Sequence, residues 1–300
     1  MANVRDFKAV MVTGAAGMLG TDMCMVLRMH GIEAIEAGIV NCSVVMDITN
    51  AESIQSAIET YKPDLLINCA AYTAVDLAES EREIALLVNC TGAGLLAEAC
   101  EKSGIPICTI STDYVFDGDN SGGYIETDEP NPIGAYAVSK YSGEVAVKLA
   151  TTRHWIVRTS WLYGINGKCF PNTILQAAKS SRTLRVVSDQ FGCPTYTVDL
   201  AEAILRIVQC APYGLYHAAG TGSTNWYEFA KRTLELANIE YPIERITTMD
   251  WPTPARRPAN STLISDAMQT SGLPILRLWN VALADYVQQW KMKQLSEADR

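Results

Sequence analysis

Short apolar runs alternate with amphipathic stretches through the first half of the chain. The strongest runs are almost continuous, which is typical of strands buried on both faces; they cover residues 8–13, 64–68, 107–111 and 155–159. Two shorter runs, at residues 32–35 and 44–46, are weaker strand candidates. Between the runs, apolar residues recur with helical spacing, which predicts helices at residues 18–30, 50–61, 83–103 and 134–150. This alternation predicts an α/β fold with a doubly wound parallel sheet, that is, a Rossmann-like architecture.

Residues at the predicted helix ends agree with this pattern. Asn50 precedes the second helix, where its side chain can accept hydrogen bonds from free N–H groups of the first turn. Gly31 follows the first helix and Gly104 the third, and glycine readily adopts the left-handed conformation of a helix end. The helix boundaries therefore rest on local signals as well as on apolar spacing.

The second half of the chain has a different character. Segments that contain proline and glycine, at residues 192–195 and 251–258, predict irregular loops. We predict two interleaved parts: a sheet domain over residues 1–160, to which about 195–215 return, and a smaller, mostly C-terminal α/β lobe over residues 161–300. Helical spacing predicts further helices at residues 173–180, 198–208, 226–237 and 276–290.

Composition narrows the classes of function. The chain has 300 residues, 48% of them hydrophobic, which suits a packed globular protein. Its formal net charge is −9, whereas a nucleic-acid-binding protein normally presents a basic surface, so we expect no nucleic-acid partner. The early apolar run contains Lys8 and then turns glycine-rich, so we predict no signal peptide, no membrane partner and a cytoplasmic protein.

Nine cysteines and three histidines raise the question of a metal site or disulfides. The cysteines show no Cys-x-x-Cys spacing, and most of them, such as Cys69 and Cys108, lie in apolar segments. Cysteines in such surroundings are typical of buried reduced thiols. We therefore predict neither a metal site nor a disulfide framework.

Three glycines mark the junction between the first strand and the first helix. Gly14 permits a tight turn, and Gly17 permits the close approach of a pyrophosphate. Gly20 permits close packing of the helix on the strand. Met18 and Leu19 open the helix, whose free N–H groups and positive dipole end favour phosphate. The junction therefore predicts a binding site for a dinucleotide cofactor.

Further contacts to this cofactor are predicted at strand ends, because open α/β sheets bind ligands at the carboxyl ends of their strands. Glu36 is the acidic residue nearest the end of the second strand and could contact a ribose. Asp47, followed by Ile48, ends the third strand and could accept a hydrogen bond from an adenine amino group. Ala70 and Ala71 follow the fourth strand and leave room for a ligand. These residues do not distinguish NADH from NADPH.

Tyr136 and Lys140 form a Tyr-x-x-x-Lys pair in the helix predicted at residues 134–150. Residues four apart lie on one helix face. An ammonium group near a phenol favours the phenolate, so we expect Lys140 to lower the pKa of Tyr136 and to make it a proton donor to a carbonyl oxygen. Lys140 can also hydrogen-bond the ribose of a nicotinamide cofactor. Thr112 follows the strand at residues 107–111 and can orient the reacting oxygen, so together the three residues predict an oxidoreductase.

Several longer blocks carry a family resemblance. They cover residues 13–20, 111–118, 136–140, 158–164, 189–195 and 257–261. They resemble the extended short-chain dehydrogenase/reductases and, among these, the dTDP-4-dehydrorhamnose reductase family. The resemblance implies NADPH- or NADH-dependent reduction of the C4 keto group of a nucleotide-linked 4-keto-6-deoxyhexose, with dTDP-4-dehydro-L-rhamnose as the first expectation.

The resemblance also implies roles for single residues. Thr112, Tyr136 and Lys140 match the catalytic trio of the family, and Trp161 falls where the family places an aromatic side chain against the sugar. Arg257 is a candidate for the substrate diphosphate, because a guanidinium matches phosphate oxygens in a fork. The predicted cofactor-binding residues are Gly14, Gly17, Met18, Leu19, Gly20, Glu36, Asp47, Ile48, Ala70, Ala71, Thr73, Tyr136 and Lys140.

The resemblance leaves assembly and some functions open. Some members form dimers around magnesium held by glutamates, but Met23 occupies one such position here, so magnesium binding and the choice between monomer and homodimer stay open. The NADP-binding regulatory subunit of methionine adenosyltransferase shares the fold, although retention of the catalytic trio favours an enzyme. Another sugar-nucleotide reductase or epimerase would share the glycine turn and the Tyr-x-x-x-Lys pair.

Overall fold

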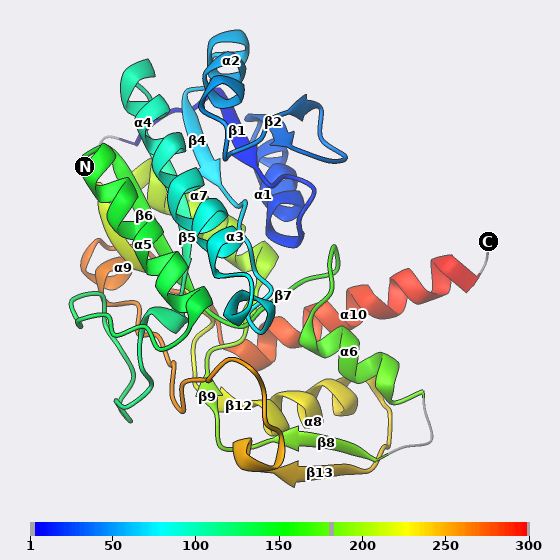
Figure 1. The fold of residues 1–300 in the computed structure, drawn as a ribbon. Helices are drawn as coiled ribbons and strands as arrows, with labels where there is room; N and C mark the ends of the chain where they lie inside the picture. The colour runs from blue at the N-terminus through cyan, green and yellow to red at the C-terminus, as the bar shows by residue number, and fades with distance from the viewer. Residues whose placement is uncertain (1–3, 180–182, 299–300) are drawn as a thin grey trace.

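The computed structural model describes residues 4–179 and 183–298, and its centre is a parallel sheet of seven strands (Figure 1). The strand order is β11-β6-β5-β4-β1-β2-β3, and every neighbouring pair is parallel. The predicted α/β fold with a doubly wound parallel sheet is confirmed. The strands are β1 (Ala9–Thr13), β2 (Glu33–Gly38), β3 (Val44–Val45), β4 (Leu65–Asn68), β5 (Ile107–Thr112), β6 (His154–Thr159) and β11 (Gly214–His217).

Helices cover both faces of the sheet. Alternate residues of β1 explain the continuous apolar run, because Val10 and Val12 pack into the cluster beneath α1 and α7, whereas Met11 packs into the cluster beneath α2 and α4. Asn50 caps α2 as predicted, since its side chain accepts hydrogen bonds from two backbone N–H groups of the first turn. The helices are α1 (Met18–Met29), α2 (Ala51–Tyr61), α4 (Ala93–Ser103), α5 (Ala135–Ala150) and α7 (Thr197–Cys210).

The helix predicted at residues 83–103 is present but is not uniform. It consists of α3 (Arg82–Leu86), a π-helical turn, η2 (Leu87–Gly92), and α4. Within the described part of the chain, Arg82–Ser103 is the one stretch long and apolar enough to cross a membrane, and 50% of its most apolar window is buried in the protein. A core helix has the same composition, and α4 packs against α2 and α5.

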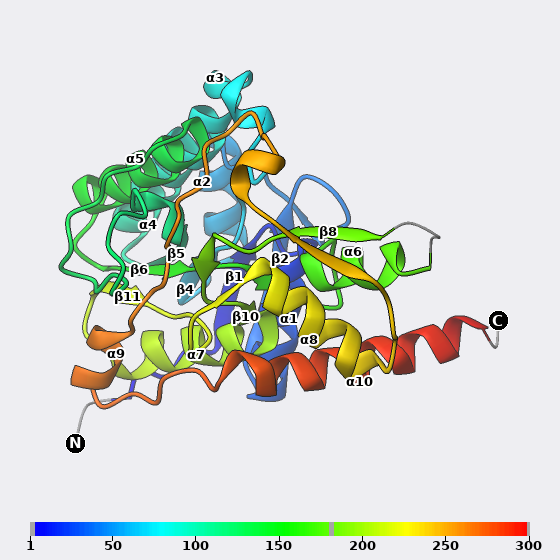
Figure 2. The same cartoon turned by 90° about the horizontal axis from the view of Figure 1, so that it is seen from below.

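A smaller unit lies below the sheet in Figure 1, on the side toward which β4 points, and Figure 2 shows α8 lying along α10. Its apolar cluster is rich in aromatic residues, including Tyr163, Phe229 and Tyr286. The chain leaves this unit to form α7 and β11 of the sheet layer and then returns to it. Its elements are α6 (Phe170–Ala177), α8 (Trp226–Ala237), α10 (Trp279–Ala298) and the strand pairs β7 (Leu162–Tyr163) with β10 (Thr195–Tyr196), β8 (Leu184–Val187) with β13 (Ile243–Ile246), and β9 (Phe191–Gly192) with β12 (Thr224–Asn225).

The second half departs most from the sequence-based prediction. α6 begins at Phe170 rather than at residue 173, because Pro171 is tolerated in the first helical turn; residue 180, the predicted end, lies outside the described residues. β11 and the short strand pairs of the smaller unit were not predicted. Two of the predicted irregular positions, Gly192 and Thr195, lie in short strands.

Candidate active site

The glycine turn joins β1 to α1 with little free space around it. Gly14 has a φ of 64°, and a Cβ added there would lie 2.8 Å from the Ala70 backbone. A Cβ at Gly20 would overlap the Gly14 carbonyl oxygen. Gly17 is the N-cap of α1 and has no side chain to cap it, so the first N–H groups of the helix remain available to an anion. The turn is a cradle that only glycine can form.

A cleft of about 530 Å³ lies beside this turn, and we call it the catalytic cleft. Its walls come from the glycine turn, from the segments that follow β4, β5 and β6, and from the start of α5. It therefore brings together the three predicted catalytic residues, most of the predicted cofactor contacts and the aromatic residue predicted to meet the sugar. The predicted residues that line it are Gly17, Met18, Leu19, Gly20, Ala70, Ala71, Thr73, Thr112, Tyr136, Lys140 and Trp161.

A second hollow, of about 500 Å³, adjoins the catalytic cleft, since Gly17, Ala70 and Ala71 line both. We call it the β2-side hollow, because the end of β2 and the loop after it, Gly38 to Cys42, form one wall. Asp47 and Ile48, two of the predicted cofactor contacts, also line it. The two spaces meet at the glycine turn and the segment that follows β4.

Three consecutive residues of β5 contact one polar face of α5. The Lys140 Nζ donates to the Ile110 carbonyl oxygen at 2.7 Å, and the Ser111 hydroxyl donates to Glu144 Oε1 at 2.5 Å. Thr112, the last residue of β5, and Tyr136 line the same cleft, and the Thr112 hydroxyl acts to lower the pKa of the Tyr136 phenol. The spacing of Tyr136, Lys140 and Glu144, each four residues from the next, aligns them on one face of the helix. The helix is thus fixed on the strand by the residues that carry the candidate chemistry.

A buried ion pair anchors the same face of α5 to β6. Arg158 Nε and Nη2 donate to the two carboxylate oxygens of Glu144 at 2.8 and 2.7 Å, and both side chains are 1% exposed. The remaining nitrogen, Arg158 Nη1, has no hydrogen-bond partner, and the guanidinium lies 5.1 Å from the centre of the Phe116 ring. Fork-like pairing of this kind fixes the geometry of both partners.

Burial decides the protonation of the catalytic groups. It raises the pKa of Tyr136 to about 12, although the Thr112 hydroxyl opposes this shift. It also lowers the pKa of Lys140 to about 8, against the opposing effect of Glu144. Our expectation of a lowered Tyr136 pKa is therefore wrong, because desolvation of the phenol is the largest cause and exceeds the lowering effect of Thr112. A neutral phenol suits a group that must donate a proton.

Asp113 adds an unpredicted carboxyl to the catalytic cleft. It follows Thr112 in η3 (Asp113–Val115), is 2% exposed and lines the cleft. Burial raises its pKa to about 7. Its Oδ1 accepts from the Thr112 hydroxyl at 3.1 Å, while its Oδ2 has no hydrogen-bond partner. Asp113 lies in the 111–118 block that carries the family resemblance, but no role was predicted for it.

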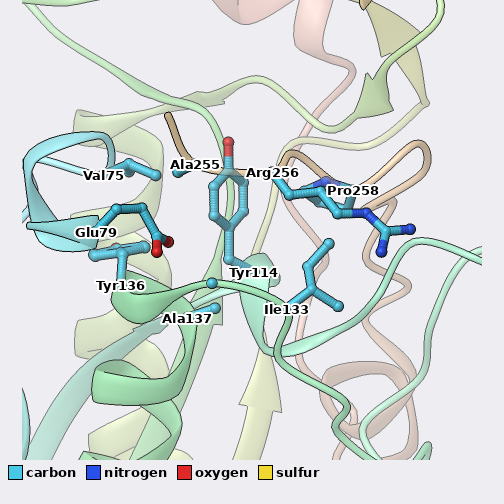
Figure 3. A pocket seen from close by; sticks show the side chains of 10 residues that line it. Val75, Glu79, Tyr114, Ile133, Tyr136, Ala137, Ala255, Arg256 and Pro258 are labelled. Carbon is cyan, nitrogen blue, oxygen red and sulfur yellow. The ribbon is translucent and has the colours of Figure 1, made fainter. Parts of the chain in front are cut away.

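Tyr114 stands between two loops that close over the start of α5 (Figure 3). Its ring meets that of Tyr136 edge-on, with 5.9 Å between ring centres. In the figure, Val75 and Glu79 lie on one side of Tyr114, and Arg256 and Pro258 lie on the other. These residues enclose a small cavity of about 10 Å³. The 255–258 segment therefore covers this end of the site.

Trp161 is held in an unusual backbone conformation, with a φ of 46°. Its indole stacks on that of Trp226, with ring centres 3.5 Å apart and planes within 7°. Gly192 lies against the same indole, and a Cβ there would come within 2.5 Å of it. Trp226 in turn donates to Gln190 at 3.2 Å. The predicted sugar-facing aromatic is thus fixed by residues of the smaller unit.

Two predicted site residues lie apart from both spaces. Glu36 lies within β2, two residues before its end, and pairs with Arg28 at 2.6 Å. Arg257 pairs with Asp76 at 2.9 Å, which ties the 255–258 segment to the loop after β4. Lys168 was not predicted but lines the catalytic cleft, as the glycine turn does. The sequence around Lys168 carries no recognisable motif that could have indicated it.

The described residues contain no group of three or more His, Cys, Asp or Glu side chains arranged to hold a metal ion. Met23, at a position where some relatives were expected to carry a magnesium ligand, is fully buried. All nine cysteines are free thiols in the structure. Burial raises the pKa of Cys24 and Cys100 to about 12, which keeps these thiols neutral.

Comparisons with known proteins agree with this geometry. Residues 8–292 match the family described as the RmlD substrate binding domain. The spore coat polysaccharide biosynthesis protein SpsK of Bacillus subtilis is 39% identical over 93% of this chain and 97% of its own length. A dTDP-4-dehydrorhamnose reductase of Aggregatibacter actinomycetemcomitans is 40% identical over 85% of this chain and 90% of its own. The crystal structure of a Bacillus anthracis dTDP-4-dehydrorhamnose reductase with NADP is 36% identical, with a TM-score of 0.90 over 94% of this chain and 99% of that one.

Proposed function

Because this chain belongs to the RmlD substrate binding domain family, we propose that it is an NAD(P)H-dependent reductase of nucleotide-linked 4-keto-6-deoxyhexoses. Its most direct reaction is the reduction of dTDP-4-dehydro-L-rhamnose to dTDP-L-rhamnose. The resemblance inferred from the sequence blocks is confirmed. The observation that carries the proposal is the meeting of Thr112, Tyr136 and Lys140 in one cleft beside the glycine turn.

The glycine cradle fits a dinucleotide cofactor. The backbone around Gly14 and Gly20 leaves no space for a Cβ, and Gly17 presents uncapped N–H groups, as a pyrophosphate requires. When bound, the cofactor supplies a hydride to the C4 carbonyl carbon of the sugar. Lys168, beside the turn, adds a cation on the side of the catalytic cleft.

The side chains around the cleft donate the proton and hold the sugar. Tyr136 donates its phenolic proton to the carbonyl oxygen, and its raised pKa keeps that proton available. Thr112 orients the same oxygen through its hydroxyl, and Lys140 holds the nicotinamide ribose. Trp161 provides an apolar face for the sugar. We assign the cofactor to residues 1–160 with α7 and β11, and the substrate mainly to the smaller unit.

A non-catalytic regulatory subunit would not need this arrangement. Such a protein could keep the cofactor cradle and lose the proton donor without loss of binding. Here Thr112, Tyr136 and Lys140 line one cleft, which supports catalysis.

The Tyr136→Phe variant tests the assignment. It removes the donated proton and keeps the ring, so turnover should fall by about 10²-fold or more while cofactor affinity stays nearly unchanged. The measurement is a steady-state assay of nicotinamide oxidation, paired with a calorimetric titration of the cofactor. Wild-type turnover in this variant would show that another group delivers the proton.

A further inference from the structure

The β2-side hollow contains no cation that could receive a 2′-phosphate. Among the described residues that line it, Asp47 is the one charged side chain, and neither lysine nor arginine is present. The loop after β2 contributes Ile39, Val40 and Cys42 to its wall, and Ile39 and Val40 are 69% and 64% exposed. Exposed aliphatic side chains of this kind suit an uncharged ligand face rather than a phosphate.

The stretch of sequence that supplies this end of the hollow, from the end of α1 to the end of α2, is acidic. Between Arg28 and Lys62 the chain carries five carboxylates and no lysine or arginine. Arg28 is itself committed to Glu36 at 2.6 Å. Two cations of the neighbouring catalytic cleft, Lys140 and Lys168, do not line the hollow. A ligand that brings extra negative charge to this hollow would therefore meet the carboxylate of Asp47 and no cation among the described residues that line it.

In folds of this type the end of the second strand meets the adenosine ribose, and an arginine there accommodates the 2′-phosphate of NADP. We infer that this enzyme prefers NADH over NADPH, because the ribose end of its site offers Gly38, Ile39 and Val40 in place of a cation. The inference rests on the proposed function and specifies its cofactor.

The preference is best measured by binding, apart from turnover. Calorimetric titration of the purified chain with NADH and with NADPH, at low and at high salt, gives the ratio of the two dissociation constants. We expect NADH to bind at least about tenfold more tightly at low salt, and we expect salt to narrow the ratio because it screens repulsion between exposed charges. Equal or tighter binding of NADPH would overturn the inference and leave the proposed function intact. Binding of neither cofactor would overturn both.

A matched pair of variants tests the location. Val40→Arg introduces a guanidinium at the wall of the hollow, whereas Val40→Gln adds similar length without charge. Val40→Arg should tighten NADPH relative to NADH by about tenfold or more, and Val40→Gln should leave the ratio nearly unchanged. Ile39→Arg provides a second position should Val40→Arg fold poorly. An unchanged ratio in folded variants of both positions would show that the ribose does not lie at this loop.

Discussion

Replacing Arg158 by methionine should lower the free energy of unfolding by about 3–5 kcal/mol. Arg158 and Glu144 are each 1% exposed and share two short hydrogen bonds, so the variant leaves a carboxylate buried beneath α5. The Ser111 hydroxyl, at 2.5 Å, then remains as a hydrogen-bond donor to Glu144, and the half-exposed Lys148, at 3.9 Å, is a weaker ionic partner. This loss of stability measures the free energy of leaving the Glu144 carboxylate buried without its partner, not the net contribution of the ion pair to the stability of the fold.

Two further variants make this magnitude testable. Arg158→Met combined with Glu144→Gln removes both charges and should recover most of the lost stability. Arg153→Met breaks the Arg153–Glu101 pair, whose side chains are 33% and 47% exposed, and should cost about 0–1 kcal/mol. The assay is denaturant unfolding followed by circular dichroism, with the four proteins compared under one condition. A loss below about 1 kcal/mol in Arg158→Met, or a double variant as unstable as the single one, would refute the reasoning.

Two other predictions concern the cleft. Lys140→Met should abolish reduction yet stabilise the fold at pH 7. Burial lowers the Lys140 pKa to about 8, so the folded protein holds a buried cation near neutral pH. Unfolding exposes this cation to water, and the variant removes its cost. Between about pH 8 and pH 10 the folded lysine is neutral while the unfolded one keeps its proton, so wild-type stability rises with pH and the advantage of the variant shrinks; a constant difference would contradict this. Trp226→Ala should raise the KM for the nucleotide sugar more than the KM for the cofactor, because it removes the ring on which Trp161 stacks. Equal effects on the two KM values would count against the sugar-facing role of Trp161.

Local patterns predicted the sheet domain well. The run at β1 and the glycines after it are consecutive in sequence, and each is explained by contacts within that turn, such as the meeting of Gly14 and Ala70. Asn50 could be recognised as a cap because capping depends on neighbouring residues alone. The candidate catalytic residues Tyr136 and Lys140 were predicted in the same way, from their spacing on one helix face, and the structure places both in one cleft.

Features that depend on distant partners were not predictable. β11 is short and begins with glycine, and it is defined by its pairing with β6. Arg257 remains a predicted substrate contact, but its ion pair with Asp76, far away in sequence, could not be foreseen. Glu36 was placed at a strand end, yet β2 continues to Gly38, so the wall of the hollow comes from the following loop. The Tyr136 pKa depends on burial, which spacing on a helix does not report.

The central claim is that this chain reduces a C4 keto group on a nucleotide-linked 6-deoxyhexose. The direct measurement incubates the purified protein with NADH or NADPH and dTDP-4-dehydro-L-rhamnose, following nicotinamide absorbance and identifying the sugar product by mass spectrometry. We predict that one equivalent of cofactor is oxidised for each equivalent of dTDP-L-rhamnose formed, and that Tyr136→Phe forms almost none. Tight cofactor binding with no sugar reduction, across a panel of 4-keto nucleotide sugars, would contradict the account.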